Sequence, residues 1–209
     1  MSAASFPLIG SVRSVQVGRA APLGPDRVMS GFVKRPVEGR VEVGLLGLAG
    51  DEQADLEVHG GPDKAVYACS LGNYAAWKAA YPQYQTLLVP GGLGENLTID
   101  GVAEGEVCIG DQMRIGTALL QVSQPRQPCF KFALRFSDLT MPRAMVRNGM
   151  SGWYYRVLEP GSLAAGDEVR LLERPHQQWS IERTNRLIIQ RHGTAAEKAE
   201  FSRLFSESR

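Results

Sequence analysis

One cysteine of this 209-residue chain stands where a thiol can become reactive. Cys129 follows the run QPRQP and precedes an apolar-periodic segment that predicts a helix. If Pro128 takes the first helical position, which suits its fixed φ and its missing N–H, Cys129 lies in the first turn. Free N–H groups at a helix N-terminus, together with Arg126 and Lys131 nearby, lower the pKa of a thiol. The segment therefore predicts a soft, anionic and accessible sulfur.

Two glycine-rich stretches combine backbone freedom with polar side chains. The first, LGLAGDEQADLEVHGGPDKAV, places His59, Gly60, Gly61 and Lys64 in one connection between strands. Because glycines lack a Cβ, such a backbone can approach a ligand closely and hold an anion through its N–H groups, with Lys64 as a counter-charge. The second, PGGLGENLTI, places the amide of Asn96 at the start of a strand. Neither stretch contains the GxxxxGK[ST] or GxGxxG pattern of nucleotide-binding loops.

Each of these features also has an ordinary structural explanation. The GGPD tetrad at 60–63 is a turn signal, and a lone histidine such as His59 is usually hydrogen-bonded within a loop. Cys69 and Cys108 lie within apolar patterns, so they are predicted to be small buried hydrophobic residues. Cys129 differs from both because proline and arginine lie beside it in the sequence.

Composition limits the class of protein. The 23 basic and 22 acidic residues give a net charge of +1, so no overall field favours nucleic acid or an anionic membrane. No apolar stretch approaches the roughly 18 residues of a membrane span, and the first residues lack the pattern of a signal peptide. Three widely spaced cysteines without a CxxC pair argue against a disulfide framework or a zinc knuckle. We therefore expect a cytoplasmic protein with neither nucleic-acid nor membrane partners.

Short β-branched runs separated by glycine-rich turns dominate the chain as far as residue 124. Because these runs do not alternate regularly with helices, we expect a β-rich α+β fold, a mixed β-barrel with flanking helices, and not a doubly wound parallel sheet. The predicted helices cover residues 71–82, the segment after Cys129, and residues 139–147. The predicted strands cover residues 12–17, 39–46, 65–69, 96–99, 106–113, 118–123, 153–158 and 168–172.

The end of the chain predicts a helical hairpin, which divides the sequence into a barrel domain at 1–174 and a helical segment at 175–209. Ser180 is expected to cap the first helix, and Gly193 to take the C′ position after it. The TAAE run that begins at Thr194 forms the T-x-x-E capping box of a second helix.

Three motifs together resemble the MOSC family, named after the C-terminal domain of molybdenum-cofactor sulfurase. They are GDEQAD with VHGGPDKAVY, then LGENLTI, then IGDQMRIGTALLQVSQPRQPC, and the likeness runs from about residue 10 to the end. Within the family, the chain is similar to the bacterial stand-alone branch that confers resistance to hydroxylaminopurine. The resemblance implies a MOSC-type barrel followed by helices. Family members have three helices in this tail, whereas only two are predicted here.

The resemblance also implies a molybdenum cofactor, in which molybdopterin holds the metal. In characterised members the protein ligand of the metal is the cysteine at the position of Cys129. A metal that already carries pterin sulfurs and oxo groups needs only one soft protein thiolate, which agrees with a solitary cysteine. A polar amide and a glycine-rich backbone are expected to line the pterin, and basic side chains to neutralise its phosphate. The expected cofactor-binding residues are Asn96, Gly60, Gly61, Lys64, Arg126 and Lys131.

The sequence supports three functions. The first is a detoxifying, cofactor-dependent reduction of N-hydroxylated compounds, purines included, to amines, with Cys129 as metal ligand and His59 as proton donor. Because three isolated cysteines cannot hold an iron–sulfur cluster, and no flavin or haem motif is visible, electrons are expected from a separate reductase. The second is a sulfur carrier or sulfurtransferase with a persulfide on Cys129 and His59 as base. The third is a non-catalytic cofactor-binding module.

Overall fold

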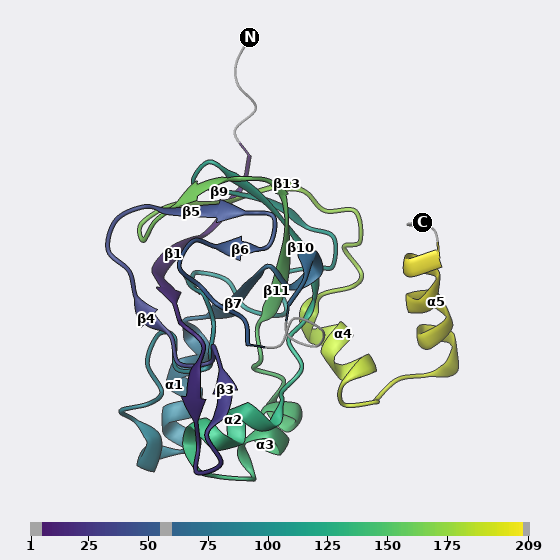
Figure 1. Ribbon diagram of the computed structural model, residues 1–209. Helices are drawn as coiled ribbons and strands as arrows, with labels where there is room; N and C mark the ends of the chain where they lie inside the picture. The colour runs from purple at the N-terminus through teal and green to yellow at the C-terminus, as the bar shows by residue number, and fades with distance from the viewer. Residues whose placement is uncertain (1–5, 55–59, 207–209) are drawn as a thin grey trace.

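A closed β-barrel forms the centre of the computed structural model, which describes residues 6–54 and 60–206 (Figure 1). Its strands are β1 (Leu8–Val17), β7 (Val66–Ser70), β8 (Leu97–Asp100), β9 (Gln112–Ile115), β10 (Ala118–Pro125), β11 (Trp153–Glu159) and β13 (Glu168–Glu173). They follow the order β13, β9, β10, β11, β7, β8 and β1, and β1 closes the ring by pairing with β13. Because β7 and β8 run parallel while the other neighbours run antiparallel, the barrel is mixed.

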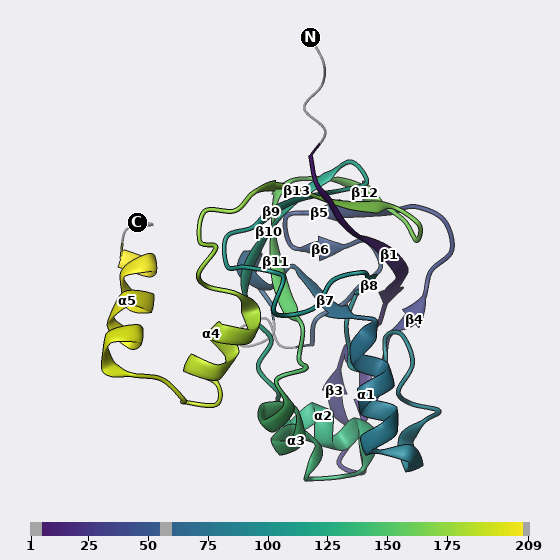
Figure 2. The same ribbon diagram turned by 180° about the vertical axis from the view of Figure 1, so that it is seen from behind.

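Shorter strands extend the barrel at its two ends. A hairpin pairs β2 with β3, β4 adds to the end of β1, and β12, β5 and β6 form a small separate sheet. In both views the small sheet lies at one end of the barrel. The hairpin lies at the opposite end, together with helices α1 (Gly72–Ala80), α2 (Phe130–Phe136) and α3 (Met141–Asn148) (Figures 1 and 2). The bounds are β2 (Ala21–Leu23), β3 (Val28–Ser30), β4 (Arg35–Pro36), β5 (Val41–Gly44), β6 (Gly47–Leu48) and β12 (Gly161–Leu163).

Along the barrel strands, side chains that fill the core alternate with side chains on the outer face. In β11, Trp153, Tyr155 and Val157 are buried in the core, whereas Tyr154 and Arg156 between them are half-buried. Successive side chains of a strand point to opposite faces, so a sequence that fills the core at every second position presents the others outside it. Tyr154 is thereby available to a surface site.

A second hydrophobic cluster holds the helices at one end of the barrel. Trp77 and Phe132 are fully buried there, with ring centroids 5.9 Å apart in an edge-on arrangement, and Phe132 also meets Phe136 at 5.0 Å. This packing fixes the helix that follows Cys129. The elements are α1 (Gly72–Ala80), α2 (Phe130–Phe136), α3 (Met141–Asn148) and the short 3-10 turns η1 (Pro62–Lys64) and η2 (Pro82–Tyr84).

Helices α4 (Ile181–Ile188) and α5 (Ala195–Ser206) follow the barrel, and α5 lies to the side of α4, away from the barrel strands (Figure 2). Both predicted caps are confirmed. The Ser180 hydroxyl accepts the backbone N–H of Arg183 at 3.1 Å, and the Thr194 hydroxyl accepts that of Glu197 at 3.2 Å while the Glu197 carboxylate accepts that of Thr194 at 2.9 Å. No helix of the described residues is both long and apolar enough to cross a membrane.

The prediction that Gly193 takes the C′ position after the first helix of the hairpin is wrong. Helix α4 ends at Ile188, and the left-handed conformation near its end belongs to Arg191, with φ of 60°. The side chain of Gln190 donates to the carbonyl of Val146 in α3 at 2.8 Å. A tertiary hydrogen bond therefore directs the chain away from the helix several residues before the glycine.

Three further predictions need correction. The expected strand at 106–113 is a turn up to Asp111, because the carboxylate of Asp111 accepts the backbone N–H of Cys108 at 2.9 Å and ends the extended run. The expected strand at 39–46 is shorter: β5 ends at Gly44, and residues 45–46 form a turn that leads into β6. Helix α2 begins at Phe130, so Cys129 is its N-cap, with extended φ and ψ of −123° and 170°, and does not lie in the first turn. The other predicted strands and helices are present, with ends shifted by a few residues.

Candidate functional site

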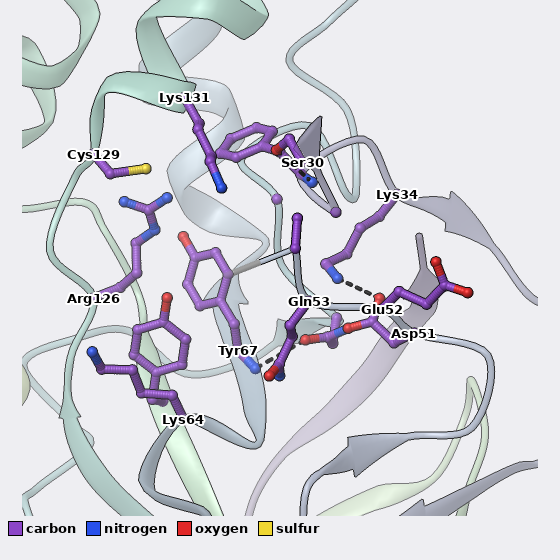
Figure 3. A pocket seen from close by; sticks show the side chains of 16 residues that line it. Ser30, Lys34, Asp51, Glu52, Gln53, Lys64, Tyr67, Arg126, Cys129 and Lys131 are labelled. Carbon is purple, nitrogen blue, oxygen red and sulfur yellow. Dashed lines mark hydrogen bonds and ion pairs between the residues drawn. The ribbon is translucent and has the colours of Figure 1, made fainter. Parts of the chain in front are cut away.

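A pocket opens where the barrel meets α2, with about 560 Å³ of open space including its mouth (Figure 3). Its lining comes from the hairpin strand β3 and the chain after it, from residues 51–54, and from β7 and β11. We call it the cationic pocket. It brings together the predicted residues Lys64, Asn96, Arg126, Cys129 and Lys131.

Cys129 is the accessible cysteine of the chain. Its side chain is half-buried, makes no capping hydrogen bond to α2, and points into the cationic pocket beside Arg126 (Figure 3). Cys69 and Cys108 are buried, as predicted, and burial raises the pKa of both thiols. Because the thiolate is the reactive form, the raised pKa and the burial disfavour reaction at Cys69 and Cys108, and Cys129 is the thiol that a reagent or ligand can reach.

Arg126 supplies a buried cation next to that thiol. Its side chain hydrogen-bonds Cys129, its Nη1 donates to the carbonyl of Gln127 at 2.5 Å, and its Cζ lies 5.4 Å from the ring centroid of Tyr67. Burial lowers the pKa of the guanidinium, but the two neighbouring tyrosines and the thiol outweigh burial, so the pKa is raised. Arg126 therefore stays charged although it is only 4% exposed.

The guanidinium of Arg126 also has an unused donor. Its Nε is buried and has no hydrogen-bond partner, and no carboxylate within the described ranges forms an ion pair with it. A buried charge without a counter-ion is costly unless a ligand compensates it. This position is suited to an anionic group.

Lysines increase the positive character of the pocket. Lys131, only 7% exposed, projects from α2 into the space, and Lys64 lines the opposite wall (Figure 3). Lys34 forms an ion pair with Asp51, and burial lowers the pKa of its ammonium group although Asp51 opposes the shift. In a protein whose net charge is +1, this is a local concentration of cations.

Asn96 lines the pocket but directs its amide into the protein. Its Oδ1 accepts the backbone N–H of Tyr67 at 3.1 Å, and its Nδ2 donates to Asp51 at 2.9 Å and to the carbonyl of Gln16 at 3.2 Å. The residue therefore fixes three segments of the wall. Its predicted contact with a cofactor stays a prediction.

The glycine loop is described only in part. His59 lies outside the described residues, so its role as proton donor or base remains a prediction from the sequence. Gly60 and Gly61 precede η1 and do not line the cationic pocket. Gly61 has φ of 86°, which favours glycine, and its carbonyl accepts the N–H of Lys64 at 3.1 Å. The ordinary explanation of the tetrad as a turn is confirmed, and the turn carries Lys64 to the pocket.

Sequence reasoning missed several lining residues, among them Phe32 and Tyr67, which lie against Arg126, and Lys34, which pairs with Asp51. Tyr67 ends the motif VHGGPDKAVY, and its position in a strand was the available signal. Phe32 and Lys34 follow the hairpin of β2 and β3, which the sequence did not reveal. Their contribution depends on a distant segment folding over Arg126, whose Cζ lies 6.0 Å from the Phe32 ring.

These features define a class of protein: a closed mixed β-barrel with helices at one end and a single accessible thiol beside a buried arginine. Comparison with known families gives the same class a name. The MOSC domain matches residues 55–170, and the chain belongs to the MOSC family. The predicted family and the predicted mixed barrel with flanking and C-terminal helices are both confirmed.

Relatives of known sequence extend the likeness over most of the chain. Uncharacterized protein YflK of Bacillus subtilis is 39% identical over 179 residues, which are 85% of this chain and 80% of that protein. Protein YiiM of Escherichia coli is 40% identical over 72% of this chain and 67% of its own length. A protein named Reductase from Gibberella moniliformis is 37% identical over 92% of this chain, which spans only 34% of that protein.

Solved structures agree with these relatives. YiiM from Geobacillus stearothermophilus superimposes with a TM-score of 0.75 at 33% identity, covering 92% of this chain and 90% of the other. YiiM from Escherichia coli gives a TM-score of 0.71 at 30% identity, covering 87% and 83%.

Proposed function

We propose that this protein binds a molybdenum cofactor in the cationic pocket and reduces N-hydroxylated compounds, including N-hydroxylated purines, to amines, as a detoxification activity. Membership of the MOSC family supports the cofactor, and the fungal relative named Reductase supports a reduction. The observation that carries the proposal is the accessible thiol of Cys129 beside the buried Arg126, whose Nε has no partner among the described residues.

The residues present fit such a cofactor. Cys129 offers one soft sulfur ligand, and the unpartnered donor of Arg126 suits an anionic oxygen or sulfur. Lys131 and Lys64 lie where they can neutralise a phosphate, and the rings of Phe32 and Tyr67 lie over the guanidinium. When bound, the cofactor supplies a centre that transfers an oxygen atom together with two electrons.

The overall reaction balances simply. The N–O bond breaks, two electrons and two protons enter, and an amine and water leave. The electrons come from a separate reductase protein. In the fungal relative named Reductase, the matched region is about a third of the chain, which supports a module that works with additional protein. His59, on sequence grounds, is the proposed proton donor.

A sulfur carrier is the second candidate, because the same observation also suits it. A half-buried thiol with an adjacent guanidinium can carry a persulfide as well as bind a metal. The two functions differ in what Cys129 holds after purification.

The test is the metal and pterin content of the full chain, produced in cells that make the molybdenum cofactor. Near-stoichiometric molybdenum is expected in the wild type, with a loss of at least about tenfold in Cys129→Ala. Cys108→Ala is the matched control, because Cys108 is buried away from the pocket. The loaded protein, with reduced viologen as electron donor, should convert 6-hydroxylaminopurine to adenine.

Other results would replace the proposal. Protein without molybdenum but with cyanide-labile sulfur on Cys129 would establish the sulfur carrier. Bound cofactor without turnover of any N-hydroxylated compound would establish a non-catalytic cofactor-binding module.

A further inference from the structure

A second hollow adjoins the cationic pocket and shares Lys64, Cys129 and Tyr154 with it. It has about 480 Å³ of open space including its mouth. This size falls within the range of roughly 300 to 1,000 Å³ that is typical of sites for small organic ligands. We call it the glutamine pocket, since its other walls are Gln124, Pro125, Gln127 and Pro128.

The two pockets differ in charge. The cationic pocket contains Lys34, Lys131 and Arg126 in addition to the shared lysine, and these four cations exceed the two lining carboxylates, Asp51 and Glu52. On the described lining of the glutamine pocket, Lys64 is the one charged side chain. A strongly anionic cofactor is therefore better placed in the first. An uncharged ligand is better placed in the second, with the same thiol within reach.

The amides of Gln124 and Gln127 are available for a ligand. Neither side chain hydrogen-bonds another residue within the described ranges, although Gln124 is half-buried. Each amide offers donors and an acceptor. Two free amides can bind a ligand edge on which a ring nitrogen, an acceptor, lies next to an exocyclic N–H group, a donor. Glutamine recognises this pair of groups on adenine.

Tyr154 provides a flat surface beside these amides. It pairs directly with Gln124 across strands β10 and β11, which places the two side chains on the same face of the sheet. The rings of Pro125 and Pro128 add apolar surface. A flat, weakly polar ligand can stack on such a wall while its edge binds the amides.

The backbone of this wall is held in place before any ligand binds. The N–H of Arg126 donates to the carbonyl of Gly152 at 3.1 Å, and the hydroxyl of Ser123 lies 3.1 Å from the carbonyl of Tyr154. The buried guanidinium holds the carbonyl of Gln127. Because the backbone of this wall is already held, binding has to order side chains and not backbone, which lowers its cost in conformational entropy.

We propose that the glutamine pocket is the substrate subsite, and that it takes a planar, uncharged nitrogen heterocycle. The amides of Gln124 and Gln127 bind the edge of the ring, Tyr154 covers its face, and the N-hydroxyl group points to Cys129. This assignment rests on the proposed function for its chemistry. The binding of the heterocycle itself is testable separately.

The test compares isosteric variants without hydrogen-bonding capacity, Gln124→Met, Gln127→Met and the double variant, with Gln85→Met as a control on an exposed position outside both pockets. Titration calorimetry measures the binding of adenine, the expected product, to the cofactor-loaded protein without reductant. Each lost hydrogen bond should weaken binding about fivefold, and the double variant should weaken it at least tenfold. Molybdenum content should not change.

Steady-state kinetics supply the second readout. The double variant should raise KM for 6-hydroxylaminopurine about tenfold, with little change in turnover of hydroxylamine, which is too small to reach the amides. Wild-type protein that does not bind adenine, or variants with unchanged adenine binding and unchanged KM for the purine, would overturn the subsite. Equal losses with both substrates would also overturn it, because they would show damage at Cys129.

The two proposals fail in different ways. Adenine binding that depends on the glutamines, in a protein that turns over no N-hydroxylated compound, would retain the subsite and reject the proposed reaction. Turnover of the purine that is indifferent to both glutamines would do the opposite.

Discussion

Asn96 and Asp51 join two segments of the pocket wall through one hydrogen bond, from Nδ2 to Oδ2 over 2.9 Å. Asp51 also accepts the backbone N–H of Gly18 at 2.8 Å and pairs with Lys34. The amide and the carboxylate together connect the chain before β2, the loop after β6 and the start of β8. The wall of the cationic pocket is therefore fixed by the protein itself.

Replacing Asn96 should destabilise the protein. In Asn96→Ala, buried polar groups on Tyr67 and Gln16 lose their partners, so we expect the free energy of unfolding to fall by about 2 to 4 kcal/mol. Asn96→Asp should be at least as harmful because it places a second carboxylate against Asp51. Urea unfolding measures both changes.

A compensating variant serves as the control for charge repulsion. Adding Asp51→Asn to Asn96→Asp removes one of the two facing carboxylates and should recover part of the lost stability. No recovery would show that the defect of Asn96→Asp comes from the geometry of the hydrogen bonds.

Arg126 should control the reactivity of Cys129. The guanidinium hydrogen-bonds the thiol, and an adjacent cation favours the thiolate. Arg126→Met should therefore slow alkylation of Cys129 by iodoacetamide about tenfold at pH 7, and Arg126→Lys should slow it less. Peptide mass spectrometry gives the rate at each cysteine, with buried Cys69 and Cys108 as internal controls. Equal rates in the wild type and in Arg126→Met would contradict the electrostatic role.

Glu95 should make stability depend on pH. It is fully buried, its Oε1 accepts the N–H of Gly91 at 2.7 Å and the hydroxyls of Thr98 and Tyr74, and its Oε2 has no partner in the described structure. Burial raises the pKa of this carboxyl although the donors oppose the shift. Because the pKa of Glu95 is higher in the folded state than in the unfolded state, its protonation stabilises the fold. This stabilisation is complete below the unfolded pKa of about 4.3 and is lost as the pH rises through the folded pKa.

The variant Glu95→Gln removes that titration. The free energy of unfolding of the wild type should fall from pH 5 toward neutrality. Over the same range, the free energy of unfolding of Glu95→Gln should rise relative to that of the wild type. Urea unfolding at several pH values measures this, with exposed Glu38→Gln as the matched control. A difference that is constant with pH would show that Glu95 does not change its protonation there.

Local signals in the sequence were sufficient for much of the fold. The alternation of Trp153, Tyr155 and Val157 predicts β11, and the caps at Ser180 and Thr194 need only residues three positions away. Such features depend on neighbours in the chain, so a single sequence contains them. The QPRQPC and GENL motifs likewise placed Cys129, Arg126 and Asn96, which the structure brings to one pocket.

The remaining features depend on distant partners. Cys108 sits in an apolar run typical of a strand, but its backbone turns because of Asp111, which Arg174 holds from another segment. The surroundings of Arg126 come from Phe32 and Tyr67, which lie far from it in sequence. The role of Asn96 in the wall depends on Asp51. No periodicity or spacing near these residues indicates which partner they find.

The ion pair formed by Asp111 and Arg174 should be sensitive to substitution because its carboxylate is buried. Asp111 is fully buried, and Arg174 donates Nε to Oδ1 at 2.9 Å and Nη2 to Oδ2 at 2.7 Å, which raises the pKa of the guanidinium. Arg174→Met leaves a buried carboxylate without its cation, so we expect a loss of about 3 to 5 kcal/mol in the free energy of unfolding. Asp111→Asn with Arg174→Met should lose less, because no charge then remains buried. A double variant less stable than Arg174→Met would show that Asp111 is stabilised mainly by the backbone N–H of Cys108, at 2.9 Å, and not by Arg174.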